Sequence, residues 1–244
     1  MNTAVATEPG LIPLSRELIK DARMMIIGYR PADPDVVRRI LPEKLTPHPD
    51  GIVLLNLWTV EDPGLSSGLG TYGRLSCGYL APEVQGYDTQ SSDGSATGHG
   101  RYFAHHWLES DGMRAFAKAS CGNVADVGRV EQHEPEPGVL VAELFVNDEV
   151  VIRTTSRVGN EKLASVGGHL NYFTSLGESS GDGDLARVSV PFVADVMEAH
   201  VESIEWLFDE NHPAAALAPR VEGAVDSVLY GNISWVPFSV AELL

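Results

Sequence analysis

Two adjacent histidines, His105 and His106, are the first residues of this chain that could do chemistry. They stand in the run RYFAHHWL, which has strand-like composition, and neighbouring side chains of a strand point to opposite faces. At most one of them can therefore enter a given pocket, and a metal site would need further ligands that stand at no recognisable spacing. We expect one of the two to line an interior cavity, and we expect no metal ion at this pair.

The usual signatures of nucleotide binding, hydrolysis and metal binding are absent from the sequence. It contains no GxxxxGKS/T, no GxGxxG between a strand and a helix, no HExxH, no paired CxxC and no GxSxG elbow. The two cysteines, Cys77 and Cys121, cannot form a disulfide framework, and a small buried role for Cys121 is favoured over a nucleophilic one. We therefore predict no cofactor.

The charge balance limits the partners of the chain. Its 244 residues include 34 acidic and 17 basic side chains, for a net charge of −17. Because such a surface does not attract polyanions, we expect neither nucleic acid nor a membrane as a partner. We expect one domain over residues 1–244, with residues 1–20 as a loosely packed N-terminal segment. No signal-peptide pattern and no apolar run of about 20 residues is present, which predicts a cytoplasmic protein.

Apolar runs of strand length dominate the chain, so we expect a mainly β fold with a few helices. The run at 52–60 is apolar throughout, which predicts a strand covered on both faces. The expected strands are Met24–Tyr29, Ile52–Val60, Tyr72–Ala81, Val139–Val146, Val150–Val158, Val188–Val193 and Ser227–Pro237.

Three segments favour helices and one polar segment favours a loop. Asp33 can cap a helix that ends before Pro42, and a second helix is expected to begin at Ser110. Apolar residues at helical spacing predict a third helix over Val193–Phe208, with His200 packed on its apolar face. The polar, glycine-rich segment 85–100 is either a flexible loop or lid over a pocket, or an exposed hairpin loop.

Four segments, taken in order, resemble the acetoacetate decarboxylase family. They are IIGYRPADPDVVRRILPEKLTP, GLGTYGRLSCGYLAP, GRYFAHHWLESDGMRAFAKASCGNVADVG and VVIRTTSRV. The first looks like that family's YRTDPDxIxxxLPEPLxP, and the third runs without a gap along its GxYxHxMYLDNxxAIxxGREIxGxPKKLG. The resemblance extends from about Arg23 to Val158. It implies a cone-shaped, mostly antiparallel β-barrel with helices packed outside, and assembly into a homo-oligomer.

The resemblance fails at the residue that carries the family's decarboxylase chemistry. Those decarboxylases form a Schiff base between a buried lysine and a β-ketone. The gap-free match puts Ala125 at that lysine and Asp126 at the lysine that follows it. The chain has only four lysines, and the nearest, Lys118, matches a family arginine. Imine catalysis is therefore not available unless Lys118 reaches the pocket.

The resemblance also implies candidate site residues. Arg30 matches an arginine that faces the substrate carboxylate, Arg74 matches a glutamate, and His106 matches a methionine of the cavity wall. We expect Arg30 or Arg74 to bind a carboxylate or polarise a carbonyl. We expect His106 to act as general acid and base, and Tyr72 to donate a hydrogen bond. The expected substrate-binding residues are Asn56, Trp58, Tyr79, Tyr102, Trp107, Lys118, Cys121 and Asn123.

These residues predict a lyase or cyclase that acts without a Schiff base on a small keto or carboxylate substrate, such as a polyketide of secondary metabolism. Cyclisation, dehydration, an aldol step or a pericyclic step all need little more than binding, orientation and a proton or hydrogen bond. Two alternatives stay open. The chain is a non-catalytic small-molecule-binding protein, or it is a keto-acid decarboxylase or aldolase that uses Lys118.

Overall fold

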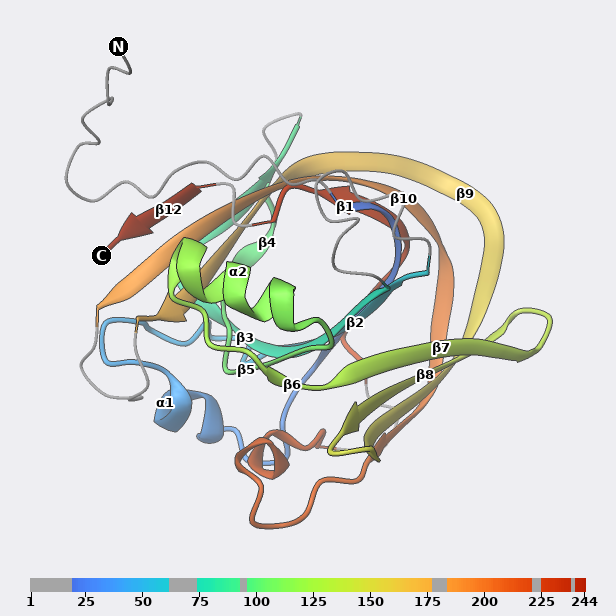
Figure 1. Cartoon of the computed structure of the whole chain (residues 1–244), viewed down its shortest axis with the longest axis horizontal. Helices are drawn as coiled ribbons and strands as arrows, with labels where there is room; N and C mark the ends of the chain where they lie inside the picture. The colour runs from blue at the N-terminus through green and yellow to red at the C-terminus, as the bar shows by residue number, and fades with distance from the viewer. Residues whose placement is uncertain (1–18, 62–73, 93–95, 177–183, 221–224, 238–239) are drawn as a thin grey trace.

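The computed structural model describes residues 19–61, 74–92, 96–176, 184–220, 225–237 and 240–244 (Figure 1). Residues 1–18 of the predicted N-terminal segment lie outside the described residues. Tyr72 lies outside them as well. No helix of the described part is long and apolar enough to cross a membrane.

Twelve strands of the described chain form one sheet, so the mainly β prediction is confirmed. Two α-helices, α1 (Val36–Ile40) and α2 (Asp111–Cys121), and a 3-10 helix at Pro213–Leu217 accompany it in the described residues. The strands are β1 (Ile19–Tyr29), β2 (Val53–Val60), β3 (Leu75–Ser91), β4 (Ala96–Tyr102), β5 (His105–Leu108), β6 (Asp126–Val127), β7 (Arg129–Glu136), β8 (Val139–Val146), β9 (Glu149–Ser175), β10 (Leu185–Trp206), β11 (Ser227–Trp235) and β12 (Val240–Leu243).

The strand pairings form a closed circuit. Antiparallel pairs lead from β10 through β11, β1 and β2 to β3, and β3 and β4 both reach β9. β9 then pairs with β10 along most of its length, which returns the circuit to its first strand. Figure 1 shows β9 and β10 curving side by side round one side of the molecule. The predicted cone-shaped, mostly antiparallel barrel is compatible with this circuit.

Side-chain alternation divides the core into two clusters, one on each side of the sheet. β1 sends Met25 and Ile27 to one cluster and Met24 and Ile26 to the other. All eight residues of β2 are buried, as the unbroken apolar run predicts. The second cluster surrounds the cavity described below.

α2 is the helix that the segment from Ser110 predicts. The Ser110 side chain accepts a hydrogen bond from the backbone N of Met113, and Gly122 ends the helix in the left-handed conformation at φ 70°. Met113, Ala117 and Cys121 form its buried face. The cap of α1 differs from the prediction, because Asp35 takes the N-cap position and Asp33 instead accepts a hydrogen bond from the backbone N of Asp35.

The predicted helix over Val193–Phe208 is wrong, because this segment is the second half of β10. Bulges between Val196 and Ala199 and between Val201 and Ser203 interrupt its pairing with β9. Each bulge shifts the two-residue alternation, and the shifted apolar positions imitate helical spacing. The predicted packed position of His200 is wrong as well, since its side chain is exposed on the strand.

Most of the polar segment 85–100 forms the ends of β3 and β4, so its described part is a hairpin and not a free loop. Thr89 is fully buried there. The tip, residues 93–95, lies outside the described residues.

The contact between β3 and β9 that closes the circuit has no room for a side chain at Gly168. A Cβ at this position would lie 2.2 Å from the backbone O of Gln90. We expect Gly168→Ala to destabilise the protein by about 1–3 kcal/mol, because the strands must separate. Gly159→Ala, also in β9, is the matched control, since the atom nearest to its Cβ would be the Glu198 Cβ, at 3.3 Å. Chemical unfolding measures both, and equal stabilities would contradict the tight closure.

Candidate active site

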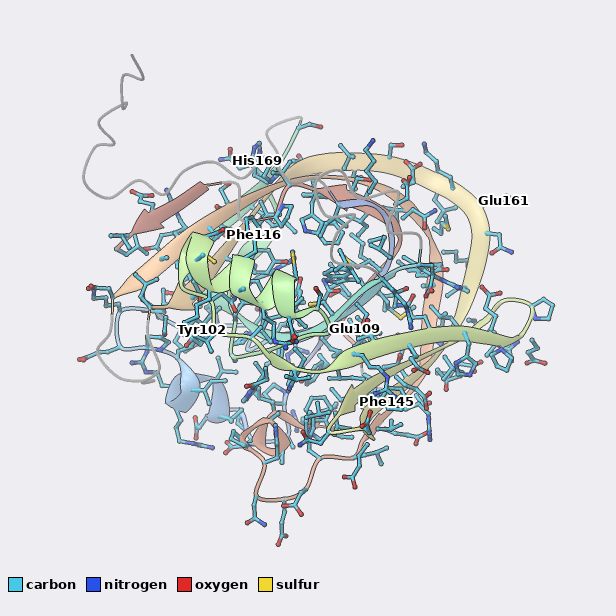
Figure 2. The ribbon with its side chains drawn as sticks, viewed as in Figure 1. Tyr102, Glu109, Phe116, Phe145, Glu161 and His169 are labelled. Carbon is cyan, nitrogen blue, oxygen red and sulfur yellow. The ribbon has the colours of Figure 1, made fainter. Side chains whose placement is uncertain are left out.

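A cavity of about 280 Å³ lies inside the second core cluster, enclosed by strands from both halves of the chain. Figure 2 shows how side chains fill most of the space that the ribbon surrounds. The volume is close to the lower end of the roughly 300–1,000 Å³ typical of ligand pockets, so the cavity suits a small molecule. Most of its wall is apolar and includes Met24, Ile26, Trp58, Phe103, Leu108, Met113, Val190, Phe192, Leu229, Ile233 and Trp235.

A connected polar group, formed by Arg101, Tyr172, Tyr79 and Asn56, stands at this wall. The Arg101 Nη1 donates to the Tyr172 hydroxyl at 3.2 Å, and the hydroxyls of Tyr172 and Tyr79 are 2.7 Å apart. Asn56 Nδ2 donates to the Tyr79 hydroxyl at 2.6 Å. These four residues link β2, β3, β4 and β9, and three of them line the cavity directly.

Arg101 is a buried cation at the cavity surface. Only 7% of the residue is exposed, and no ion pair joins it to a carboxylate among the described residues. Its Nε has no hydrogen-bond partner in the part of the chain that the structure describes. A buried guanidinium with unused donors is suited to bind an anionic or carbonyl oxygen of a ligand.

Tyr79 keeps its proton under ordinary conditions. Its complete burial raises the pKa of the phenol well above its usual value, and the neighbouring Tyr172 raises it further. Arg101 acts in the opposite direction but does not outweigh the burial. Tyr79 is therefore a neutral hydrogen-bonding group rather than a base.

His106 forms a second polar group with Cys77 and Asn123. Its Nδ1 lies 3.0 Å from the Asn123 Oδ1, and its Nε2 lies 3.3 Å from the Cys77 Sγ. An amide oxygen only accepts, so Nδ1 carries the proton and Nε2 is an acceptor at the cavity wall. Burial lowers the pKa of His106 to about 4, and the Asn123 contact opposes this only in part. Burial also raises the pKa of the Cys77 thiol, which keeps it protonated.

The structure brings five of the predicted site residues together. Trp58, Tyr79 and His106 line the cavity, and Asn56 and Asn123 stand directly behind Tyr79 and His106. His105 points away from the cavity and stacks on Trp107 at 5.7 Å between ring centroids, so the prediction that only one histidine of the pair enters the pocket is confirmed.

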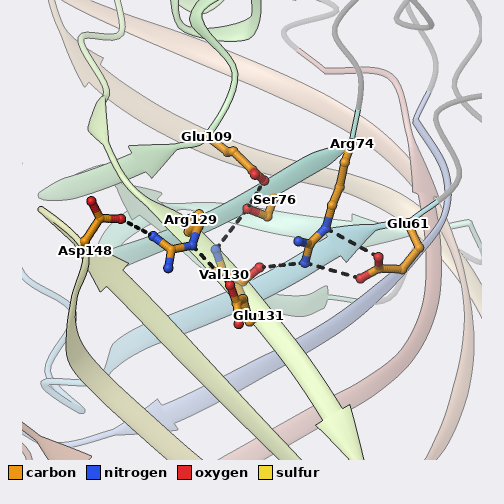
Figure 3. A network of polar contacts seen from close by, with 8 residues as sticks. All are labelled: Glu61, Arg74, Ser76, Glu109, Arg129, Val130, Glu131 and Asp148. Carbon is orange, nitrogen blue, oxygen red and sulfur yellow. Dashed lines mark hydrogen bonds and ion pairs between the residues drawn. The ribbon is translucent and has the colours of Figure 1, made fainter.

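The two predicted arginines lie outside the cavity lining. Arg30 is exposed, pairs with Asp226 and donates from its Nε to the backbone O of Asp50 at 3.0 Å. Figure 3 shows Arg74 in a surface network, where its Nε is 3.4 Å from Glu61 and its Nη2 donates to the backbone O of Val130 at 3.2 Å. Neither guanidinium is available to a ligand inside the cavity in this conformation.

Four further predicted residues also lie outside the lining. Tyr102 and Trp107 belong to the other core cluster, across the sheet. For Tyr102 the reason is a break in the strand before His105, which shifts the alternation by one residue, whereas Trp107 follows His106 directly in β5 and so points to the opposite face. Cys121 is buried in α2, where its Sγ donates to the Ala117 O at 3.3 Å, and Lys118 is exposed on the same helix.

Sequence reasoning missed two of the central polar residues, Arg101 and Tyr172. Their Cα atoms are register partners in the short parallel pairing of β4 with β9. Unbroken alternation in RYFAHHWL would put Arg101 on the face opposite His106, whereas the strand break puts both at the cavity. No local signal in the sequence pointed to Tyr172.

No lysine lines the cavity, and all four lysines of the chain fall within the described residues. Lys20, Lys44, Lys118 and Lys162 are all exposed. Ala125, the position matched to the catalytic lysine of the decarboxylases, is partly buried and packs against the cluster that surrounds the cavity.

Solved structures place this chain in a defined fold class. No protein-family model and no curated protein sequence matches the chain. Its fold, however, is the acetoacetate decarboxylase-like fold, so the resemblance noted in the sequence is confirmed at the level of the fold.

Three structures illustrate the match. Acetoacetate decarboxylase from Legionella pneumophila is 14% identical with a TM-score of 0.67, over 99% of this chain and 91% of that one. The enduracididine biosynthesis enzyme MppR, complexed with pyruvate, is 15% identical with a TM-score of 0.58, over 99% and 90%. An acetoacetate decarboxylase-like enzyme from Sphingomonas wittichii RW1 is 14% identical with a TM-score of 0.54, over 100% and 96%.

The low pKa of His106 predicts a defined pH dependence. An unfolded histidine has a pKa of about 6.5, and that of folded His106 is about 4. As the pH falls from about 6.5 to about 4, the unfolded state gains a proton on this histidine that the folded state does not take up. The stability contributed by neutral His106 is therefore present above this window and lost within it.

NMR titration of the imidazole, with His106→Gln to assign its resonances, measures the value. The unfolding free energy of His106→Gln should also fall less steeply than that of the wild type over the same pH range. A midpoint near that of a free histidine would contradict the buried, neutral state.

Proposed function

We propose that this chain is an enzyme that acts without a Schiff base on a small, largely apolar keto or carboxylate compound. The observation that carries the proposal is the apolar cavity whose buried cation is Arg101, with no lysine in its lining. The reaction class is a lyase or cyclase step, such as an aldol condensation, a dehydration or a ring closure.

Arg101, Tyr172 and Tyr79 supply the electrostatic part of this chemistry. An imine-forming decarboxylase delocalises the electrons of the broken bond into an iminium ion. Here the guanidinium and the two hydroxyls would instead hold the oxygen of the substrate and stabilise the negative charge of an enolate. The apolar wall excludes water, which strengthens this interaction. The charge of Arg101 is permanent, because guanidinium groups do not lose their proton in proteins.

His106 would act mainly as a hydrogen-bond acceptor. Its pKa of about 4 makes it a weak base near neutral pH, where the best proton acceptors have a pKa close to the operating pH. This favours steps that need orientation and stabilisation of charge on oxygen, with little proton transfer to the imidazole. A pericyclic step, in which no proton is transferred, meets that requirement.

Two structures of a protein with the same fold support the substrate class. MppR has been seen with pyruvate, a keto acid, and with the condensation product of pyruvate and imidazole 4-carboxaldehyde. A protein of this fold therefore binds a keto acid and the product of a carbonyl condensation.

Binding of apolar keto acids should depend on Arg101 and not on the arginines outside the cavity. We expect Arg101→Gln and Tyr172→Phe each to weaken binding by about 10–100-fold, since hydrogen bonds to a charged group contribute roughly 1.5–3 kcal/mol. Trp58 and Trp235 line the cavity, so quenching of tryptophan fluorescence reports occupancy.

Arg30→Gln and Arg74→Gln are the matched controls, because they remove the same charge outside the lining. Loss of binding in Arg30→Gln, with Arg101→Gln unaffected, would restore the site implied by the family resemblance. Mass spectrometry of the same keto acids after incubation separates an enzyme from a binder. Tight binding without any product would favour the non-catalytic alternative.

Borohydride reduction in the presence of a keto acid tests the imine route directly. Because Lys118 is exposed on α2, we expect no covalent adduct on the wild-type chain. Lys118→Ala provides the comparison. An adduct that disappears in Lys118→Ala would overturn the proposal and establish the decarboxylase or aldolase alternative.

A further inference from the structure

Three metal-ligating side chains meet at the β3–β4 hairpin, outside the cavity lining. They are Glu83 of β3, His99 of β4 and His48 of the segment between α1 and β2. One ligand atom from each lies within 4.8 Å of the others. Two atoms bound to one tetrahedral zinc ion are roughly 3.4 Å apart, so the three side chains must move closer together to hold an ion.

We propose that His48, Glu83 and His99 bind one divalent transition-metal ion of the Zn²⁺ class. This site is separate from the cavity, and the inference does not rest on the proposed function.

The backbone holds two of the ligands together. The backbone N of His48 donates to the Glu83 O at 3.0 Å, and the N of Glu83 donates to the Ile52 O at 3.0 Å. The backbone N of Gln85, two residues after Glu83, donates to the O of Thr46, two residues before His48, at 2.9 Å. The segment that carries His48 is therefore fixed against β3, so metal binding needs little ordering of the chain.

A carboxylate outside the cluster orients one of the two imidazoles, because His99 Nδ1 lies 2.9 Å from the Asp88 Oδ1. His48 Nδ1 lies 3.4 Å from the Asp50 Oδ2 and accepts a hydrogen bond from the backbone N of Asp50 at 3.4 Å, so metal binding at its Nε2 requires the ring proton to move to Nδ1. Histidines that bind metals commonly donate their second ring N–H to a carboxylate, which leaves the Nε2 lone pair for the ion. The two rings are stacked, with 3.5 Å between their centroids and 18° between their planes, so they must tilt toward each other before both lone pairs point at one ion.

The charge of this region favours a divalent cation. Glu83 is buried, with 7% exposed, and no ion pair or hydrogen bond of its side chain is found within the described residues. Three carboxylates face the two histidines, those of Glu83, Asp50 and Asp88. The positive charge of Arg101 attracts the Glu83 carboxylate. With neutral imidazoles, three carboxylates against one guanidinium leave two negative charges uncompensated. A divalent ion would balance them.

The ligand set indicates the class of metal. Two imidazole nitrogens and one carboxylate oxygen are the donors that zinc and its neighbours prefer, whereas calcium and magnesium prefer oxygen alone. Three protein ligands leave at least one position for water. The ion would join the segment at His48 to the β3–β4 hairpin.

Titration of the EDTA-treated full-length chain with Zn²⁺ tests the site. We expect saturation at one ion per chain and a higher unfolding temperature, because the ion binds the folded state. Co²⁺ used in place of Zn²⁺ should show the visible absorption of a histidine-coordinated ion. His48→Gln and His99→Gln should each weaken binding at least tenfold, and Asp88→Asn by about 10–100-fold.

His200→Gln is the matched control, since His200 is exposed on β10 and belongs to no cluster of ligands among the described residues. Its affinity for Zn²⁺ should equal that of the wild type. Glu83→Gln is compared only after circular dichroism shows that it folds, and the two histidine variants decide the outcome if it does not. Binding that is absent, or that is unchanged in both histidine variants, would overturn the proposal.

Discussion

The pairing of β9 with β10 is the constraint on which the rest of this structure depends. It runs from Leu185 opposite Ser175 to Trp206 opposite Ile152, and the other edge of β9 meets β3 and β4. Side chains alternate along a strand, so a slip of one residue would exchange the cavity face for the opposite face. The position of Tyr172 beside Arg101 therefore follows from the register of strands that are distant in sequence.

The sequence predicts those elements whose signals are local. β2 was predicted from its unbroken apolar run, β8 from its strand-like composition, and α2 from the helical spacing of the apolar residues that follow Ser110. The first part of β10 was predicted as the strand Val188–Val193, but its second half was not, because bulges in its pairing with β9 shift the alternation there. When the partner strand is not known, the apolar positions of a bulged strand resemble the spacing of a helix, because each bulge shifts the two-residue alternation.

The same distinction separates the site residues that were found from those that were missed. Tyr79 and His106 stand in segments that resemble a known family, Trp58 stands in the unbroken apolar run at 52–60, and all three line the cavity. Arg101 reaches Tyr172 only through pairing across 71 residues of sequence. His48 and Glu83 likewise meet through backbone contacts between distant segments, so their spacing carries no recognisable pattern.

Arg101 connects the cavity to the proposed metal site. It is the register partner of Glu83, whose negative charge lies behind it. Burial raises the pKa of Glu83, and Arg101 together with the two histidines opposes that shift. A metal ion on Glu83 would take up the charge of the carboxylate and leave the guanidinium less compensated toward the cavity. Because electrostatic interactions are strong in a buried, apolar site, the affinity of Arg101 for an enolate or carboxylate oxygen would then increase. In the proposed function, Arg101 is a cation that cannot lose its charge, and the neighbouring Glu83 would set how much of that charge a substrate meets.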